Sequence, residues 1–198
     1  FGHASTDMNQ QWQGLTAART SNLKLCNRND VTDKTNPTHI SSIVYNNLGF
    51  VHQGWFTKDL SYFMVGDELD ELRMGNKTRS IIFDFTDLDN PAVHFDYLGT
   101  TNAIDHNGYV KNNVYYQANY TGGVRMIDIS NVANKVFSEI GFFDTYPENN
   151  NTAFNGVWNV YPYFPSGHIL ALDMTNGAFI LKPSPTIGLK EHMQNNFS

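Results

Sequence analysis

The sequence predicts an all-β, propeller-like array of about three to four blades of antiparallel strands, forming part of a larger propeller. Aromatic residues make up 14% of the chain and charged residues only 16%, a balance that favours strands because aromatic side chains suit a pleated, half-buried surface. Short alternating runs are bounded by Asn, Asp, Gly and Pro, as strands and turns are. Related segments recur at a spacing of about 45 to 54 residues, the length of a propeller blade.

The first two repeats open on His52 and His106. "HQGWFTKDLSYFMVG" and "HNGYVKNNVYYQANY" share a histidine, a polar residue, a glycine and an aromatic residue before a strand-like run. A third copy opens on Phe154 with "FNGVWNVYPYFPSGHILALD". Equivalent units of this size bury their apolar faces against one another, so these three segments should each begin a sheet.

Each unit continues with further strand-like runs. The runs at 61–66, 79–85 and 92–99 belong to the first unit, and those at 114–118, 124–129 and 136–143 belong to the second. Linkers that begin at Asp30, Asp84 and Asp128 carry an asparagine six residues later. Asp, Thr and Asn side chains bond nearby backbone groups in turns, so these linkers should be turns before a last strand.

The unit that begins at His52 carries about ten extra residues, and they include Asp67, Glu68, Asp70 and Glu71. Residues 59–74 have the spacing of an amphipathic helix, but Gly66 and the strand-like matching repeat favour a strand there.

Several ordered motifs match a known family. "DVTDKTNP", "HQGW", "DELDE", "IDHNGYV", "QANYTGGVRMIDIS", "GFFDTYPE" and "FNGVWNVYPYFPSG" resemble the C-terminal half of LVIVP-repeat proteins of the choice-of-anchor B family. The resemblance implies a β-propeller-like domain over residues 30–185 in an exported protein that is held at the cell surface or released. It brings no established enzymatic activity. Residues 1–29 match poorly, as a partial blade or linker, and residues 186–198 are expected to be a linker or tail.

Composition limits the partners. The formal net charge of −6 argues against nucleic acid. No apolar run is long enough to span a membrane. A single cysteine, Cys26, excludes an internal disulfide. Four N-x-[ST] acceptors for glycans are compatible with an extracellular protein, and they lie at Asn76, Asn119, Asn150 and Asn196.

The strongest candidate site is a divalent-cation site. Carboxylates suit Ca²⁺, and histidine ligands shift the preference towards Zn²⁺ or Mn²⁺. The candidate ligands are His52, Asp67, Glu68, Asp70, Glu71, Asp105 and His106. Two alternatives stay open. The acidic residues would form a solvated loop beside Arg73, Lys77 and Arg79, and the histidines would bond neighbouring blades.

Aromatic residues recur near one repeat position, at Trp55, Tyr109 and Trp158. They suit either a platform that stacks on a carbohydrate or peptide, or packing between blades.

The sequence therefore leaves three hypotheses. The first is an extracellular or cell-surface binding or assembly module, steadied by a divalent cation, whose partner is a protein, a glycan or another copy of the chain. The second is a metal-dependent surface hydrolase that uses the two histidines and the acidic loop. The third is a structural subunit of a surface filament or coat.

Overall fold

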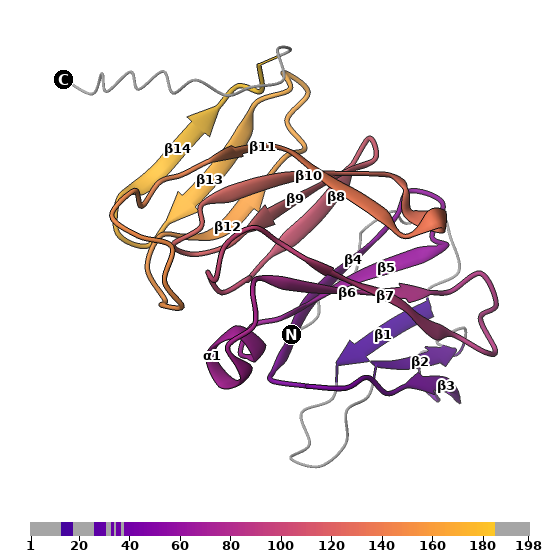
Figure 1. The fold of residues 1–198 in the computed structure, drawn as a ribbon. Coiled ribbons are helices and arrows are strands. Elements are labelled where there is room, and N and C mark those ends of the chain that lie inside the picture. Colours follow the sequence, from indigo (N-terminus) through magenta and orange to yellow (C-terminus); the bar gives the residue numbers. More distant parts are fainter. Residues whose placement is uncertain (1–12, 18–25, 31–32, 34, 37, 185–198) are drawn as a thin grey trace.

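A computed structural model describes residues 13–17, 26–30, 33, 35–36 and 38–184 of the chain. They form four antiparallel sheets that follow one another in chain order, from the indigo end of Figure 1 to the yellow end. The prediction of an all-β, propeller-like array is confirmed. The expected tail at 186–198 lies outside the described residues, as does most of the segment 1–29.

The strands of each sheet lie side by side in sequence order. The first sheet contains β1 (Gln13–Ala17), β2 (Cys26–Asp30) and β3 (Thr38–Ile43). The second contains β4 (Val51–Phe56), β5 (Tyr62–Asp67), β6 (Arg79–Asp84) and β7 (Ala92–Leu98). The third contains β8 (Gly108–Lys111), β9 (Val114–Ala118), β10 (Val124–Asn131) and β11 (Val136–Phe143). The fourth contains β12 (Val157–Tyr161), β13 (Ile169–Asp173) and β14 (Gly177–Leu181). Within the described residues, the helices are α1 (Asp70–Met74) and the 3-10 turn η1 (Val132–Asn134), both short.

The predicted starts of the repeats coincide with the starts of sheets. His52 lies on β4, His106 lies two residues before β8, and Phe154 lies three residues before β12. These three strands are the first of their sheets, and β8 lies against both β4 and β12. The opening segments of three sheets therefore meet at one place in the array.

Successive residues of a strand face opposite sides, and here both sides are covered. In the second sheet, Met64 and Ile82 face the third sheet, whereas Val65, Ile81 and Phe83 face the first. Each of the five side chains has an exposed fraction of 1% or less. An apolar side chain on each face explains why these strands read as nearly continuous apolar runs.

Three apolar clusters fill the spaces between neighbouring sheets. Each cluster takes side chains from two neighbouring sheets, and some of its buried members are as follows. The first contains Ile43, Tyr45, Val65, Ile81 and Phe83, the second Met64, Ile82, Tyr115 and Ile127, and the third Tyr116, Val124, Val157 and Ala171. Face-to-face packing of successive sheets thus forms the core and fixes the relative position of the loops at their ends.

The turns contain the residues that their backbone conformations favour. Lys111 pairs with Val114 across a two-residue hairpin loop, and Asn112 and Asn113 both have positive φ, as a type I′ turn requires. In the linkers, the carboxylate of Asp84 accepts the N–H of Thr86 at 2.8 Å. Asp128 accepts the N–H of Ser130 at the same distance.

The segment with the extra residues differs from the expectation. Its first half is a strand, β5, but residues 70–74 form the helix α1, so the prediction of a strand there was wrong. Gly75 ends the helix in the left-handed conformation with φ 71°. Because the chain turns after Asp67, its acidic side chains leave in different directions.

Candidate metal centre

Three segments from two sheets bring His52, Glu68 and His106 together. His52 lies on the first strand of the second sheet, and Glu68 directly follows the strand beside it. His106 enters from the loop that leads into the third sheet. The N–H of Glu68 donates to the carbonyl of Phe50, which fixes the end of β5 against the start of β4. The centre therefore depends on the contact between two sheets.

The side chains of these three residues are close enough to share one ion. One ligand atom from each lies within 4.8 Å of those of the other two. His52 Nδ1 lies 3.4 Å from Glu68 Oε2, and His106 Nε2 lies 3.5 Å from Glu68 Oε1. The two imidazole rings lie 4.2 Å apart between centroids. Two nitrogens and a carboxylate thus converge on one point.

A backbone carbonyl fixes the orientation of His106. Its Nδ1 bonds to the carbonyl oxygen of Trp158 on β12, and because that oxygen only accepts, Nδ1 carries the hydrogen. Burial lowers the pKa of His106, against an opposing effect from Glu68. The neutral ring then presents the lone pair of Nε2 to a carboxylate, and two acceptors face each other. A cation between them removes the repulsion.

Tyr120 supports the carboxylate from the third sheet. Its hydroxyl donates to Glu68 Oε1 at 2.8 Å, and its ring contacts that of His106 edge-on at 5.2 Å. The carbonyl of Tyr120 accepts the N–H of Val157, which ties the same turn to the fourth sheet. Tyr120 was not among the site residues predicted from the sequence. Its place in the polar turn "NYTGG" carries no local signal for a contact with Glu68, which lies 52 positions earlier in the chain.

The distances from Glu68 to the two histidines are compatible with zinc. Ligands about 2.05 Å from a tetrahedral zinc ion lie about 3.3 Å from one another. The histidines lie 3.4 and 3.5 Å from Glu68, each from a different carboxylate oxygen, and the three ligand atoms lie within 4.8 Å of one another. Two imidazoles and one carboxylate form a zinc-type set, whereas Ca²⁺ prefers six to eight oxygens. The side chain of His52 is 28% exposed and those of Glu68 and His106 are 13% and 10% exposed, so the centre is reachable from solvent on the side of His52.

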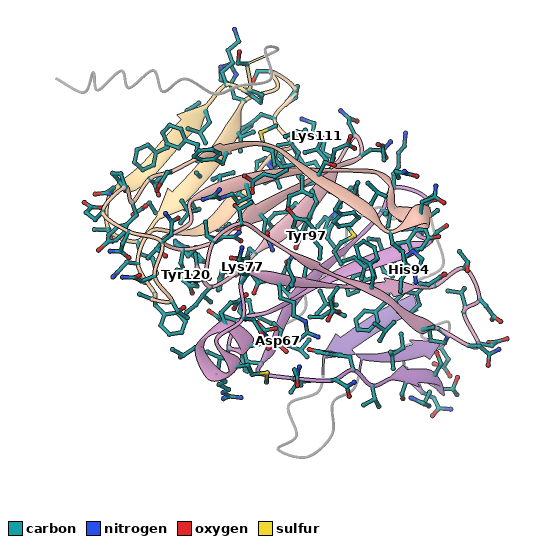
Figure 2. The ribbon with its side chains drawn as sticks, viewed as in Figure 1. Asp67, Lys77, His94, Tyr97, Lys111 and Tyr120 are labelled. Atoms are coloured by element: carbon teal, nitrogen blue, oxygen red, sulfur yellow. The ribbon has the colours of Figure 1, made fainter. Side chains whose placement is uncertain are left out.

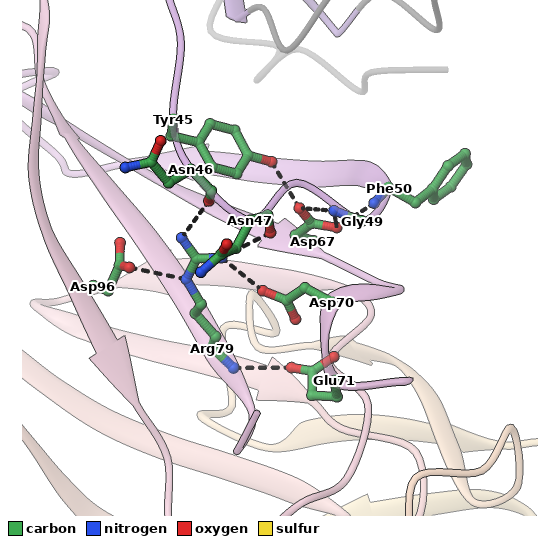
Figure 3. Close-up of polar contacts among 10 residues, drawn as sticks. All are labelled: Tyr45, Asn46, Asn47, Gly49, Phe50, Asp67, Asp70, Glu71, Arg79 and Asp96. Carbon is green, nitrogen blue, oxygen red and sulfur yellow. Dashed lines mark hydrogen bonds and ion pairs between the residues drawn. The ribbon is translucent and has the colours of Figure 1, made fainter. Parts of the chain in front are cut away.

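Asp67 is not part of this centre. Its carboxylate accepts the N–H groups of Gly49 and Phe50 and the hydroxyl of Tyr45, as Figure 3 shows. Figure 2 places Asp67 and Tyr120 on the side of the stacked sheets where α1 lies in Figure 1. Asp67 therefore organises the turn that precedes β4 and has no capacity left for an ion.

Asp70 and Glu71 bind Arg79. Arg79 Nη1 lies 3.0 Å from Asp70 Oδ2, and the backbone N–H of Arg79 donates to Glu71 Oε1 at 2.9 Å (Figure 3). Arg79 also reaches Asp96 and the carbonyls of Asn46 and Asn47. Asp70 and Glu71 are almost fully buried. The alternative of a solvated acidic loop was therefore wrong for both, although Arg79 is indeed their partner.

Asp105 is buried next to His106 but is not one of the three residues whose ligand atoms lie within 4.8 Å of one another. Among the described residues, neither of its carboxylate oxygens has a hydrogen-bond donor. Burial raises its pKa well above the ordinary value, and the neighbouring carboxylates add to the effect. The carboxyl group is packed so closely over Gly66 that a Cβ there would lie 2.5 Å from it. The surroundings of Asp105 thus favour its neutral form over its charged form.

The three repeated aromatic residues have different surroundings in the structure. Trp55 and Tyr109 pack edge-on at 4.8 Å between the first strands of two sheets, and Tyr163 joins them. Tyr109 also donates to Asn159 on β12 at 3.2 Å. Trp158 instead lies 5.9 Å from His106 and is 38% exposed. Packing between sheets explains Trp55 and Tyr109, and Trp158 is the one of the three that is exposed beside the centre.

The possible glycan acceptors differ in exposure. Asn150 is exposed and Asn76 is partly exposed. Asn119 is 2% exposed and donates to Gln117 at 3.2 Å, so the folded chain does not offer it for modification. Asn196 lies outside the described residues.

Comparison with known proteins gives the fold alone. No protein-family model matches the chain, and no curated protein matches it. A crystal structure of a protein from Lactobacillus plantarum, from the Northeast Structural Genomics Consortium, is similar with a TM-score of 0.56 over 80% of this chain. The two sequences are 10% identical, and the chain spans 50% of the length of that protein. In the described residues, no helix has the length and apolar character to cross a bilayer.

Proposed function

We propose that this chain is an extracellular, propeller-like binding or assembly module that holds a zinc ion between two of its sheets. The observation that carries the proposal is the convergence of His52, Glu68 and His106 from three separate segments within 4.8 Å. The hydrogen bond of His106 to a backbone carbonyl and that of Tyr120 to Glu68 are the contacts that orient ligands around zinc.

An ion at this position would hold the sheets together. It joins β4 and the end of β5 to the loop before β8, and His106 extends the connection to β12. A ligand set that forms only in the folded chain converts metal affinity into folding stability. The module would therefore present its surface to a protein or glycan partner in a fixed shape.

Metal titration tests the proposal. After chelation and dialysis, the chain should bind one zinc ion per molecule by calorimetry and melt at a higher temperature with zinc. Glu68→Gln and His52→Ala should each lose both effects, because each removes one of three ligands. His168→Ala is the matched control, since that ring bonds only to nearby Ser166 among the contacts described. Zinc binding that survives both ligand substitutions would contradict the proposal.

A metal-dependent hydrolase is the second candidate. The number of candidate ligands supports a hydrolase, because catalytic zinc has three protein ligands and keeps a fourth position for water. His52 lies on the solvent side of the centre, where such a position would open. Zinc-dependent cleavage of chromogenic esters or phosphodiesters that disappears in Glu68→Gln would favour it, and zinc binding without turnover would leave the first candidate.

The proposal of an extracellular location draws on the exposed acceptor at Asn150. Secretion from a glycosylating host should yield a glycoprotein whose mass falls by one glycan in Asn150→Gln. Asn119→Gln should leave the glycan mass unchanged because Asn119 is buried.

A further inference from the structure

Five buried side-chain oxygens have no hydrogen-bond partner within the described residues. They are Asp70 Oδ1, Glu71 Oε2, both carboxylate oxygens of Asp105 and Asn119 Oδ1. The four residues are at most 2% exposed. All five atoms are acceptors, and a buried acceptor without a partner costs free energy. A donor or a cation is therefore needed where these oxygens lie together.

The backbone places Asp105 across from Asn119. The N–H of His106 donates to the carbonyl of Ala118 at 2.9 Å, and the N–H of Ala118 donates to the carbonyl of Asn107 at 2.8 Å. The two segments run antiparallel, so the residue before His106 lies opposite the residue after Ala118. Side chains opposite one another in an antiparallel pair lie on the same face. Asp105 and Asn119 therefore carry their unpartnered oxygens on one side of the third sheet.

A second series of contacts leads from Asn119 back to Asp105. Asn119 Nδ2 donates to Gln117 Oε1 at 3.2 Å, and Gln117 Nε2 donates to the hydroxyl of Ser80 at 2.9 Å. Ser80 on β6 pairs with Gly66 on β5. The carboxylate of Asp105 lies directly over Gly66, where a Cβ would be 2.5 Å from Oδ2. The carboxylate and the amide oxygen thus lie in the same space between the second and third sheets.

Glu71 brings a second carboxylate to this space from α1. Its Oε1 accepts the N–H of Arg79, which directly precedes Ser80, as Figure 3 shows. Its Oε2 has no partner. Glu71 is the charged group that acts most strongly on Asp105. Asp70 differs because its other oxygen pairs with Arg79 at 3.0 Å, so its charge is already balanced.

We propose that Glu71, Asp105 and Asn119 bind a calcium ion between α1 and the second and third sheets. Their unpartnered atoms are all oxygens, and carboxylates and asparagine carbonyls are the ligands that Ca²⁺ prefers. Two carboxylates balance its two charges. Glu71 Oε2, both oxygens of Asp105 and Asn119 Oδ1 supply four positions, and water completes the six to eight that the ion takes.

The calcium site shares no ligand with the zinc centre. Among histidine and acidic residues of the described part of the chain, His52, Glu68 and His106 form the one group of three whose ligand atoms lie within 4.8 Å. The amide oxygen of Asn119 is therefore needed as the third ligand for calcium. In the calcium-free chain, burial raises the pKa of both Glu71 and Asp105, so calcium replaces protons when it binds.

Terbium luminescence and melting of the full, zinc-loaded chain test the proposal. Because the site is buried, the chain is refolded from urea with the probe ion present. Burial and the charge of Asp105 raise the pKa of Tyr115, so that ring is near enough to sensitise Tb³⁺. One terbium ion per chain should luminesce, and calcium should displace it. Calcium should also raise the melting temperature by several degrees, and magnesium should raise it less, because it requires octahedral geometry.

Two variants test the location. Asp105→Asn keeps the shape of the side chain but removes its charge, and it should lose both the luminescence and the calcium-dependent shift. Asp89→Asn is the matched control at an exposed position and should behave like the unmodified chain. Glu68→Gln, which removes a zinc ligand, should keep the calcium effect.

The unmodified chain decides the proposal even if Asp105→Asn fails to fold. Neither terbium luminescence nor calcium-dependent melting in that chain would overturn it. A calcium effect that survives in folded Asp105→Asn, or that disappears in Glu68→Gln, would overturn it as well, because the ion would then lie elsewhere.

Discussion

Replacing Glu71 with glutamine should make the protein more stable at alkaline pH. Burial and the charge of Asp70 raise the pKa of Glu71 from its ordinary value of 4.5 to about 9. Glu71 Oε1 accepts the N–H of Arg79. Glu71 Oε2 and Asp70 Oδ1 are buried without a partner, and a proton on Glu71 would let it donate to the neighbouring Asp70. Glutamine offers the same donor and the same acceptor at every pH.

The direction of the pH effect on stability follows from the number of protons bound by the folded and by the unfolded chain. Between about pH 4.5 and 9, folded Glu71 keeps a proton that the unfolded chain has released. The folded state binds more protons, so the free energy of unfolding falls as pH rises through this window. Each pKa unit corresponds to about 1.4 kcal/mol, which gives an upper limit near 5 kcal/mol at pH 8. Because Asp70 titrates with Glu71, we expect a gain on the order of 2 kcal/mol for Glu71→Gln at pH 8.

Urea unfolding at pH 5 and pH 8 measures the effect. Glu71→Gln should unfold like the unmodified chain at pH 5 and at a higher urea concentration at pH 8. Glu148→Gln, an exposed change of the same chemistry, should follow the unmodified chain at both pH values. Equal pH dependence in all three proteins, or a less stable Glu71→Gln at pH 8, would refute the protonated state of Glu71.

Three further substitutions test other parts of the structure. Arg79→Met should lower the free energy of unfolding by about 3 to 5 kcal/mol, because it leaves the carboxylate of Asp70 buried without its cation. In the same urea assay, substitution of the exposed arginine by Arg73→Met should lower it by less than about 1 kcal/mol. Tyr120→Phe should weaken zinc binding about 10- to 100-fold in a chelator competition, since Glu68 loses its supporting donor, whereas Tyr146→Phe should leave the affinity unchanged. Gly123→Ala should lower the melting temperature by several degrees more than Gly75→Ala. Both glycines have positive φ, but only at Gly123 would a Cβ meet a backbone oxygen, at 2.3 Å from that of Phe143.

The sequence predicted the sheets well because their signals are local. The apolar runs of β5 and β6 and the Asn112–Asn113 turn are determined by side-chain alternation and φ preference, both of which are visible in the residue order. The helix α1 was missed because residues 70–74 have no counterpart in the other repeats. The strand expected from the matching repeat therefore ends before them, at Asp67.

The candidate centre was predicted only in part. Matching positions in two repeats pointed to His52 and His106, and the inserted acidic segment pointed to Glu68. Which acid faces the histidines depends on the turn after β5 and on the partners of the others. Asp67 is bound by backbone N–H groups and Asp70 by Arg79. These contacts join residues far apart in sequence, and composition and spacing carry no signal for them.

Anomalous diffraction at the zinc absorption edge tests the central proposal most directly. Crystals grown with zinc should show one strong anomalous peak about 2.0 to 2.2 Å from ligand atoms of His52, Glu68 and His106. The peak should be absent from crystals of Glu68→Gln grown under the same conditions. Zinc bound only at other residues, or no peak between the two histidines, would contradict a metal centre that joins these sheets.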